Sequence, residues 1–120
     1  VVHGEDGLDE ISITGPTNVS AYKDFKINEY AIRPEEFGIA SAPFEDIAAQ
    51  SSEESLRMVQ EAFAGEKSAV QDMIALNSGA ALYIARKVDS ISEGVELAFD
   101  LMNNGKAADK LAAYVRVSNI

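Results

Sequence analysis

Residues 1–10 hold the side chains of this 120-residue sequence that are best suited to chemistry. They include four carboxylates (Glu5, Asp6, Asp9 and Glu10), two glycines and the chain's only histidine, but no lysine or arginine. Carboxylate oxygens without a cysteine or histidine cluster suit a hard cation such as Mg²⁺. Mg²⁺ typically takes one or two protein carboxylates and completes its shell with water and substrate phosphate. The carboxylates of this stretch are therefore suited to a Mg²⁺ site.

Asp9 and Glu10 are the candidate metal ligands. Neighbouring side chains on a regular strand point to opposite faces, so the two could share an ion only on a bent backbone. Gly7 permits such a bend because it has no Cβ to clash. An acidic loop that faces water remains the simpler interpretation of the same residues.

The other candidates offer less. His3 is alone in the sequence, which gives no metal-ligand spacing, and we expect it to have a structural role at a strand end. We interpret Asn77–Gly79, inside an apolar helical run, as a site of close helix packing. The turn at Gly15–Thr17 could offer backbone N–H groups to a phosphate, but a plain turn explains it equally well.

The elements that must position the acidic loop are strands. Val1 and Val2 predict the end of a buried strand, and residues 11–14 alternate apolar with polar, as a half-buried strand does. Residues 19–22 and 27–32 predict a hairpin connected by residues 23–26. Pro34 ends the third strand because it cannot donate to a ladder.

From Ser51 onward the apolar residues recur about every 3.6 positions, which is the spacing of a helix. Capping boxes that begin at Ser51, Ser68 and Ser90 predict three helices, of which the first stops at Gly65 and the third at Gly105. A last amphipathic turn or two follows. The second helix is expected to be largely buried. Its apolar side is formed by Val70, Met73, Ile74, Asn77, Ala81 and Ile84, and Leu76 and Tyr83 widen that surface.

These elements predict an α+β fold, with a small, mainly antiparallel sheet and three to four packed helices. We expect a single domain over residues 1–120, strand-rich in residues 1–34, connecting in 35–50 and helical in 51–120. Because the chain opens on valine inside a predicted strand, we interpret it as a fragment.

Composition narrows the function. A net charge of −10 argues against nucleic acid or an anionic membrane as a partner, since both require a basic face. The absence of cysteine excludes disulfides, thiolate catalysis and zinc fingers, and it is compatible with a cytoplasmic location. No signal peptide or membrane-spanning stretch is found in the sequence.

Several segments resemble, in order, the C-terminal part of anthranilate phosphoribosyltransferase. They are Val2-His3-Gly4-Glu5-Asp6-Gly7-Leu8-Asp9-Glu10, Ile13-Thr14-Gly15-Pro16-Thr17, Tyr30-Ala31-Ile32-Arg33-Pro34-Glu35-Glu36-Phe37-Gly38, Gly65-Glu66-Lys67 and Leu76-Asn77-Ser78-Gly79-Ala80-Ala81-Leu82-Tyr83. The resemblance covers nearly all of this chain but about the last third of such an enzyme. It implies that the chain is the C-terminal part of a larger α/β phosphoribosyltransferase domain.

The resemblance also implies the chemistry. Such an enzyme moves a phosphoribosyl group from phosphoribosyl pyrophosphate to anthranilate in tryptophan biosynthesis, releases pyrophosphate and requires Mg²⁺. Asp9 and Glu10 match the positions at which that family binds the metal, and complete members are commonly homodimers. The family's glycine-rich and basic motifs lie upstream of the matched region, so the fragment alone is expected to be inactive.

Two alternatives stay open. One is a piece of a pyrimidine-nucleoside-phosphorylase-like enzyme, which would not use this acidic pair. The other is a non-catalytic acidic module that binds Ca²⁺ or a basic protein through the same loop.

Overall fold

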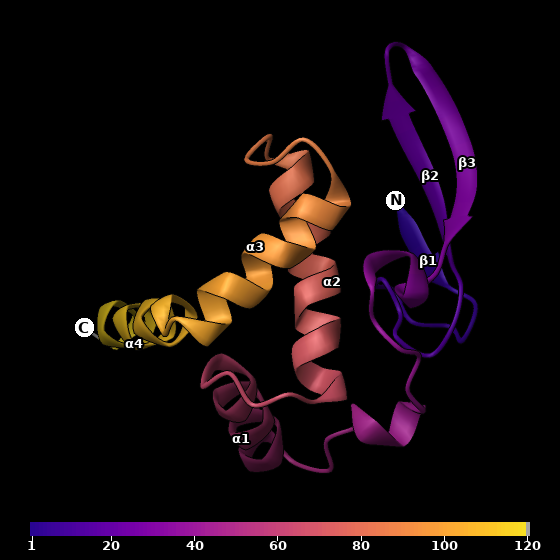
Figure 1. Cartoon of the computed structure of the whole chain (residues 1–120). Coiled ribbons are helices and arrows are strands. Elements are labelled where there is room, and N and C mark those ends of the chain that lie inside the picture. The colour runs from indigo at the N-terminus through magenta and orange to yellow at the C-terminus, as the bar shows by residue number, and fades with distance from the viewer. Residues whose placement is uncertain (120) are drawn as a thin grey trace. The chain divides into compact units, whose positions relative to one another are not determined.

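The computed structural model describes residues 1–119 and divides into two compact units, residues 1–47 and a unit from residue 48 onward (Figure 1). Among these residues the first unit holds three strands and the second holds four α-helices. The predicted α+β class is confirmed. The single domain over residues 1–120 stays a prediction.

The sheet is antiparallel and consists, in order, of β1 (Val2–Gly4), β2 (Thr17–Lys23) and β3 (Lys26–Ile32). β2 and β3 form the long hairpin drawn in purple in Figure 1, which confirms that prediction. Its turn is shorter than the predicted connection at residues 23–26, because Lys23 still pairs with Lys26. Asp24 and Phe25 make the turn, with φ angles of 52° and 61°. Two-residue turns with positive φ match the right-handed twist of paired strands.

Residues 11–14 do not form a strand, so that prediction is wrong. Ser12 and Ile13 are adjacent and both buried, at 1% and 0% exposure, and the side chains therefore do not alternate between core and solvent. The Ser12 amide donates to Oγ1 of Thr17 (2.9 Å), and the Thr14 amide donates to Oγ of Ser12 (3.0 Å). These hydroxyls compete with regular backbone pairing and fold the segment into a bent loop.

β1 is a short edge strand, so the strand predicted here is confirmed, but Val2 is only half-buried. It pairs with β2, with Val2 opposite Val19. Gly4 is its one buried residue, and Val1, just ahead of it, is 95% exposed. No second strand among residues 1–119 pairs with β1, whose Val2 is half-buried and whose His3 is exposed.

The connection to the helices contains two short 3₁₀-helices, η1 (Pro34–Phe37) and η2 (Phe44–Asp46). As predicted, sheet pairing stops just before Pro34, because proline has no N–H for the ladder. The Arg33 amide donates instead to Oε1 of Glu36 (2.8 Å) and begins η1.

The helical unit contains α1 (Ser52–Phe63), α2 (Ala69–Ile84), α3 (Ile91–Asn103) and α4 (Lys106–Ser118). The hydroxyls of Ser51, Ser68 and Ser90 each accept from the backbone amide three residues on, at 3.1 to 3.2 Å. Gly65 and Gly105 have φ angles of 85° and 83°, typical of helix ends. The three predicted helices are confirmed.

α4 has thirteen residues and is longer than the predicted turn or two. None of its residues is buried, which explains the weak apolar pattern. Four of its thirteen residues are alanine, which has the highest intrinsic helix propensity.

The buried side of α2 agrees with the prediction only in part, because Leu76 is buried as expected but Gln71 and Ala75 were not expected there. Its buried residues are Gln71, Ala75, Leu76 and Gly79. By contrast, Ile84, expected on the packed side, is 77% exposed. One reason for the difference is Gly79, whose missing side chain lets a neighbouring backbone approach where a larger residue would not.

α2 and α3 approach most closely where Gly79 meets Gly94. A Cβ built on Gly79 would lie 2.6 Å from the backbone nitrogen of Val95, and one on Gly94 would meet the Gly79 carbonyl closer still. Neither position has room for a side chain. The predicted close packing at Asn77–Gly79 is therefore confirmed for its glycine.

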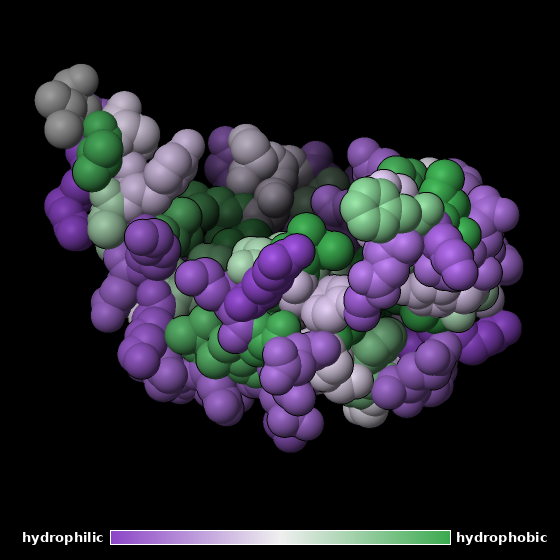
Figure 2. All heavy atoms as spheres, turned by 90° about the horizontal axis from the view of Figure 1, so that it is seen from above, coloured by the Kyte–Doolittle hydropathy of each residue, from purple (hydrophilic) through white to green (hydrophobic). Residues whose placement is uncertain are grey.

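Apolar side chains also reach the surface. Tyr22 and Phe25 on the hairpin are 70% and 94% exposed, and Tyr114 and Val117 on α4 are 70% and 69% exposed. Figure 2 shows apolar patches between hydrophilic side chains on one face of the molecule. Within residues 1–119, no helix is long and apolar enough to cross a membrane.

Candidate functional site

Asp9 and Glu10 lie in the loop that joins β1 to β2. The chain bends at both residues instead of running as a strand, and Gly7, just before them, has a φ angle of 95°. The bend predicted from Gly7 is therefore present. A bent backbone releases the two side chains from the alternation of a strand.

Both carboxylates face solvent. No other described residue is seen to form a hydrogen bond or ion pair with either of them, and the ion pairs that the structure does show belong to Arg57 of α1, with Glu54 and Glu61. Asp9 and Glu10 thus keep their oxygen lone pairs available for an added ligand.

The donor set fits Mg²⁺ but does not complete its shell. Within residues 1–119, no group of three or more His, Cys, Asp or Glu side chains could hold a metal ion. Asp9 and Glu10 would supply two hard oxygen ligands. Mg²⁺ accepts such an incomplete protein site because it keeps several waters and binds substrate phosphate.

Asp6 fixes the shape of this loop. Its Oδ1 accepts from the Leu8 amide (3.0 Å), and its Oδ2 accepts from the hydroxyls of Ser12 and Thr14. The Thr14 hydroxyl lies 3.2 Å from that of Ser12. One carboxylate therefore joins the part of the loop before Asp9 to the part after Glu10.

The hydrogen bonds of Asp6 favour its charged form. Partial desolvation raises the pKa of its carboxyl, but the hydroxyls of Ser12 and Thr14 and the Leu8 amide together outweigh that effect. The pKa of Asp6 consequently lies below its ordinary value. Donors that stabilise a carboxylate also resist its protonation.

Gly4 makes room for the Asp6 carboxylate. A Cβ on Gly4 would collide with Oδ1 of Asp6 and lie 3.2 Å from the Cβ of Ser12. Backbone bonds close the same turn, from the Gly4 amide to the Leu8 carbonyl (2.9 Å) and from the Gly7 amide to the Gly4 carbonyl (3.0 Å). Gly4 is needed because the Asp6 carboxylate lies where its side chain would be, and Gly7 is needed because its φ angle is positive.

The other sequence candidates are placed as follows. His3 is exposed on β1, opposite Asn18. The turn before β2 belongs to the loop itself, because the Glu5 amide donates to the Pro16 carbonyl (3.0 Å). The Asn77 side chain donates to the Met73 carbonyl of its own helix (3.1 Å).

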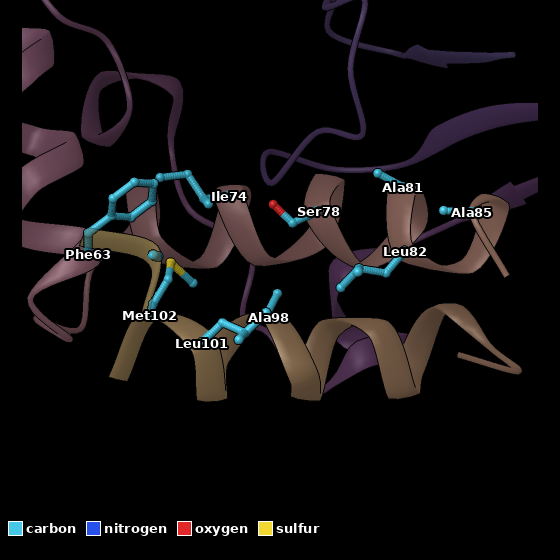
Figure 3. Close-up of a pocket in the computed structure, with 10 residues that line it drawn as sticks. Phe63, Ile74, Ser78, Ala81, Leu82, Ala85, Ala98, Leu101 and Met102 are labelled. Atoms are coloured by element: carbon cyan, nitrogen blue, oxygen red, sulfur yellow. The ribbon is translucent and has the colours of Figure 1, made fainter. Parts of the chain in front are cut away.

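The helical unit carries an apolar groove of about 430 Å³. Figure 3 shows side chains of α2 and α3 converging on it, with Phe63 at one end. Its lining residues are Phe63, Ile74, Ser78, Ala81, Leu82, Ala85, Ala98, Leu101, Met102 and Ala107. Only Ser78 offers a polar side chain, so the groove does not suit a charged phosphate.

The role of Asp6 was missed by the sequence reasoning. Two local signals could have indicated it. An Asp two residues before the amide it binds is typical of an Asx turn, and the Ser12-x-Thr14 spacing can place two hydroxyls together when the backbone is not a strand. Predicting a strand over residues 11–14 concealed the second signal.

Comparison with known proteins places this geometry in a family. Residues 1–108 match the family model described as the glycosyl transferase family, a/b domain. The anthranilate phosphoribosyltransferase of Halorhodospira halophila is 44% identical over 115 residues, which is 96% of this chain and 34% of that protein. The chain thus spans about a third of the length of the curated relatives it matches.

Solved structures of anthranilate phosphoribosyltransferases are similar to this chain in fold. The crystal structure of anthranilate phosphoribosyltransferase from Thermus thermophilus is similar to 97% of this chain, with a TM-score of 0.87 and 37% identity, over 34% of its own chain. The Saccharomyces cerevisiae enzyme in complex with PRPP and Mg reaches a TM-score of 0.86 at 23% identity, over 99% of this chain and 35% of its own. The yeast likeness concerns the fold alone.

Proposed function

This chain belongs to the glycosyl transferase family, whose a/b domain it matches, and from that premise we propose that it contributes the Mg²⁺-binding loop of an anthranilate phosphoribosyltransferase. The complete enzyme would transfer a phosphoribosyl group from phosphoribosyl pyrophosphate to anthranilate and release pyrophosphate, a step of tryptophan biosynthesis. The observation that carries the proposal is the pair Asp9 and Glu10, bent out of strand geometry and without a protein partner among residues 1–119.

The chemistry of the reaction explains why this loop is useful. As pyrophosphate departs, negative charge grows on its oxygens, and a bound Mg²⁺ would offset that charge. Asp9 and Glu10 would hold and orient the ion. Neither carboxylate needs to carry a proton, because their part is that of ligands.

The comparisons support the Mg²⁺ and substrate assignments indirectly. The yeast relative was solved with PRPP and Mg, and that finding concerns the yeast protein. We extend it to this chain because hard oxygen donors stand at Asp9 and Glu10. A cytoplasmic location and a homodimer of the complete enzyme belong to the same proposal.

Calorimetry of the 120-residue chain tests the metal site. Mg²⁺ is titrated in the presence and absence of pyrophosphate, which represents the leaving group. We expect Mg²⁺ binding that pyrophosphate strengthens, and we expect the double variant Asp9→Asn/Glu10→Gln to lose it.

The chain offers a matched control in Glu45 and Asp46. These are also adjacent and exposed, but they lie in η2 and not in the bent loop. Glu45→Gln/Asp46→Asn removes the same charge and should leave Mg²⁺ binding unchanged. Equal losses in both double variants, or no Mg²⁺ binding by the unaltered chain, would overturn the site. Tight Ca²⁺ binding that pyrophosphate does not strengthen would favour an acidic binding module instead.

A chimera tests the activity. Residues 1–120 replace the matching third of the Thermus thermophilus enzyme, and transfer of the phosphoribosyl group to anthranilate is measured. We expect activity, a loss of about 100-fold or more with Asp9→Asn/Glu10→Gln, and no loss with Glu45→Gln/Asp46→Asn. A chimera that folds by circular dichroism but transfers nothing contradicts the proposed function.

A further inference from the structure

The carboxylate of Asp6 is the most heavily hydrogen-bonded side chain of the acidic loop. It accepts from the Leu8 amide and from the hydroxyls of Ser12 and Thr14. An ionised carboxylate has about four acceptor positions, so three of them are filled from within the protein. Asp6 is therefore poorly placed to be a metal ligand and well placed to hold other residues.

Leu8, just before the Asp9–Glu10 pair, and Ser12, two residues after it, are both held by hydrogen bonds. On one side, the Leu8 amide binds Asp6, and the Leu8 carbonyl accepts from the Gly4 amide. On the other side, Ser12 is buried at 1% exposure, its hydroxyl donates to Asp6, and its amide donates to Thr17. The free pair thus spans a short gap between two anchors.

A short span between fixed ends has few conformations available. A ligand pair that is already ordered loses less conformational entropy when it binds, and side chains that orient metal ligands can change metal affinity by about 10- to 100-fold. The anchors of the Asp9–Glu10 pair meet at a single group, the Asp6 carboxylate.

We propose that Asp6 is a positioning residue, which holds the Asp9–Glu10 segment in the bent conformation that binds Mg²⁺ by bridging Leu8 to the hydroxyls of Ser12 and Thr14. This inference rests on the proposed function, since it assigns Asp6 a part in the same metal site. It places Asp6 outside the ligand set.

The first test compares Asp6→Asn with Glu5→Gln in the 120-residue chain. Both remove one carboxylate charge from the loop, but the exposed Glu5 side chain bonds to no other described residue, and its backbone amide, which donates to Pro16, is unchanged by the substitution. We expect Asp6→Asn to weaken Mg²⁺ binding in the presence of pyrophosphate by about 10-fold and Glu5→Gln to change it by less than about 2-fold. Equal effects of the two variants would mean that charge alone matters and would overturn the inference.

The second test separates positioning from ligation through Thr14. Thr14→Val removes the hydroxyl at nearly constant volume, and Thr14→Ser keeps it. We expect Thr14→Val to weaken Mg²⁺ binding and Thr14→Ser to preserve it. Adding Asp6→Asn to Thr14→Val should cost less than the sum of the two single changes, because both break one network. If Thr14→Val leaves Mg²⁺ binding unchanged while Asp6→Asn abolishes it, Asp6 is a ligand and the inference is wrong.

Amide hydrogen exchange tests the positioning role of Asp6 separately from Mg²⁺ binding. If the unaltered chain binds no Mg²⁺, the proposed function fails. The positioning role is then judged from the amides of residues 8–14, which should exchange faster in Asp6→Asn but not in Glu5→Gln. Unchanged exchange in Asp6→Asn would overturn the positioning role whatever the metal does.

Discussion

The contact between α2 and α3 at Gly79 allows a stability prediction from backbone geometry. In Gly79→Ala the new Cβ would lie 2.6 Å from the backbone nitrogen of Val95 and 2.7 Å from its Cγ2. Ordinary contact between such atoms is about 3.5 Å, so the helices would have to separate by roughly 1 Å. Backbone atoms cannot rotate away as a flexible side chain can.

The magnitude follows from two opposing effects. Overpacking of a filled core costs about 1 to 3 kcal/mol, and we take the upper end because helix backbone meets helix backbone. Alanine in place of a helical glycine returns up to about 1 kcal/mol of helix propensity. We therefore expect Gly79→Ala to lower the free energy of unfolding by about 2 kcal/mol.

Urea unfolding followed by circular dichroism at 222 nm measures this effect, with Ser92→Ala as the control. Ser92 lies on α3 but is exposed, so its change should stay within about 0.5 kcal/mol. Gly94→Ala should also destabilise. The double glycine variant should cost less than the sum, since one separation of the helices relieves both clashes. A Gly79→Ala protein as stable as the unaltered chain would refute this reasoning.

Three further predictions follow from other parts of the chain. Phe25→Gly should slow amide exchange across β2 and β3 and stabilise the hairpin by about 0.5 to 1 kcal/mol, because glycine tolerates the positive φ angle; Phe25→Ala, which keeps the strain, should not. The Asp6 pKa is lower in the folded chain than in the unfolded chain, so its contribution to stability is complete at neutral pH and is lost only as the pH falls below about 4; a carboxyl titration by NMR with a midpoint at or above that of an unfolded peptide would contradict this. The buried Gln71 donates to the Ala62 carbonyl (3.1 Å) and to Oδ1 of Asn103 (3.2 Å), so Gln71→Met should destabilise by about 1 to 2 kcal/mol in urea, and Asn103→Ala should cost less.

The sequence predicted those helices and strands whose ends are set by residues a few positions away in the chain. Each of the first three helices begins at a serine that accepts from an amide three residues on, so the cap is visible in the sequence. The hairpin was predictable because two strand-like runs flank a short polar segment of the right length for a turn, and the two runs do pair. The burial of Gln71 on α2 was not predictable, because it depends on bonds to Ala62 and Asn103, which lie on two other helices.

In the candidate site, too, the features set by neighbouring residues were predicted and those set by more distant residues were not. The bend at Asp9 and Glu10 follows from the neighbouring Gly7 and was predicted. The network around Asp6 depends on hydroxyls six and eight residues away. Their apolar–polar alternation with Ile11 and Ile13 is typical of a strand, but bonds of these hydroxyls to Asp6 and of the Ser12 amide to Thr17 override it. Side-chain bonds that replace backbone pairing are therefore the part of this fold that local pattern does not predict.

If the loop binds pyrophosphate through Mg²⁺, the negative charge of the loop must first be offset. Residues 1–10 carry four carboxylates and no lysine or arginine, so the loop by itself repels a pyrophosphate group. Two unit charges 4 Å apart interact by about 4 kcal/mol near a protein surface, which is more than hydrogen bonds from this loop could offset. A divalent ion shared by Asp9 and Glu10 would cancel the charge of that pair, while Asp6 keeps its own charge within its hydrogen bonds. On this proposal the metal is a condition for substrate binding and not only an aid to catalysis. The basic groups that hold the phosphates are then expected in the two thirds of the relatives' length that this chain does not span.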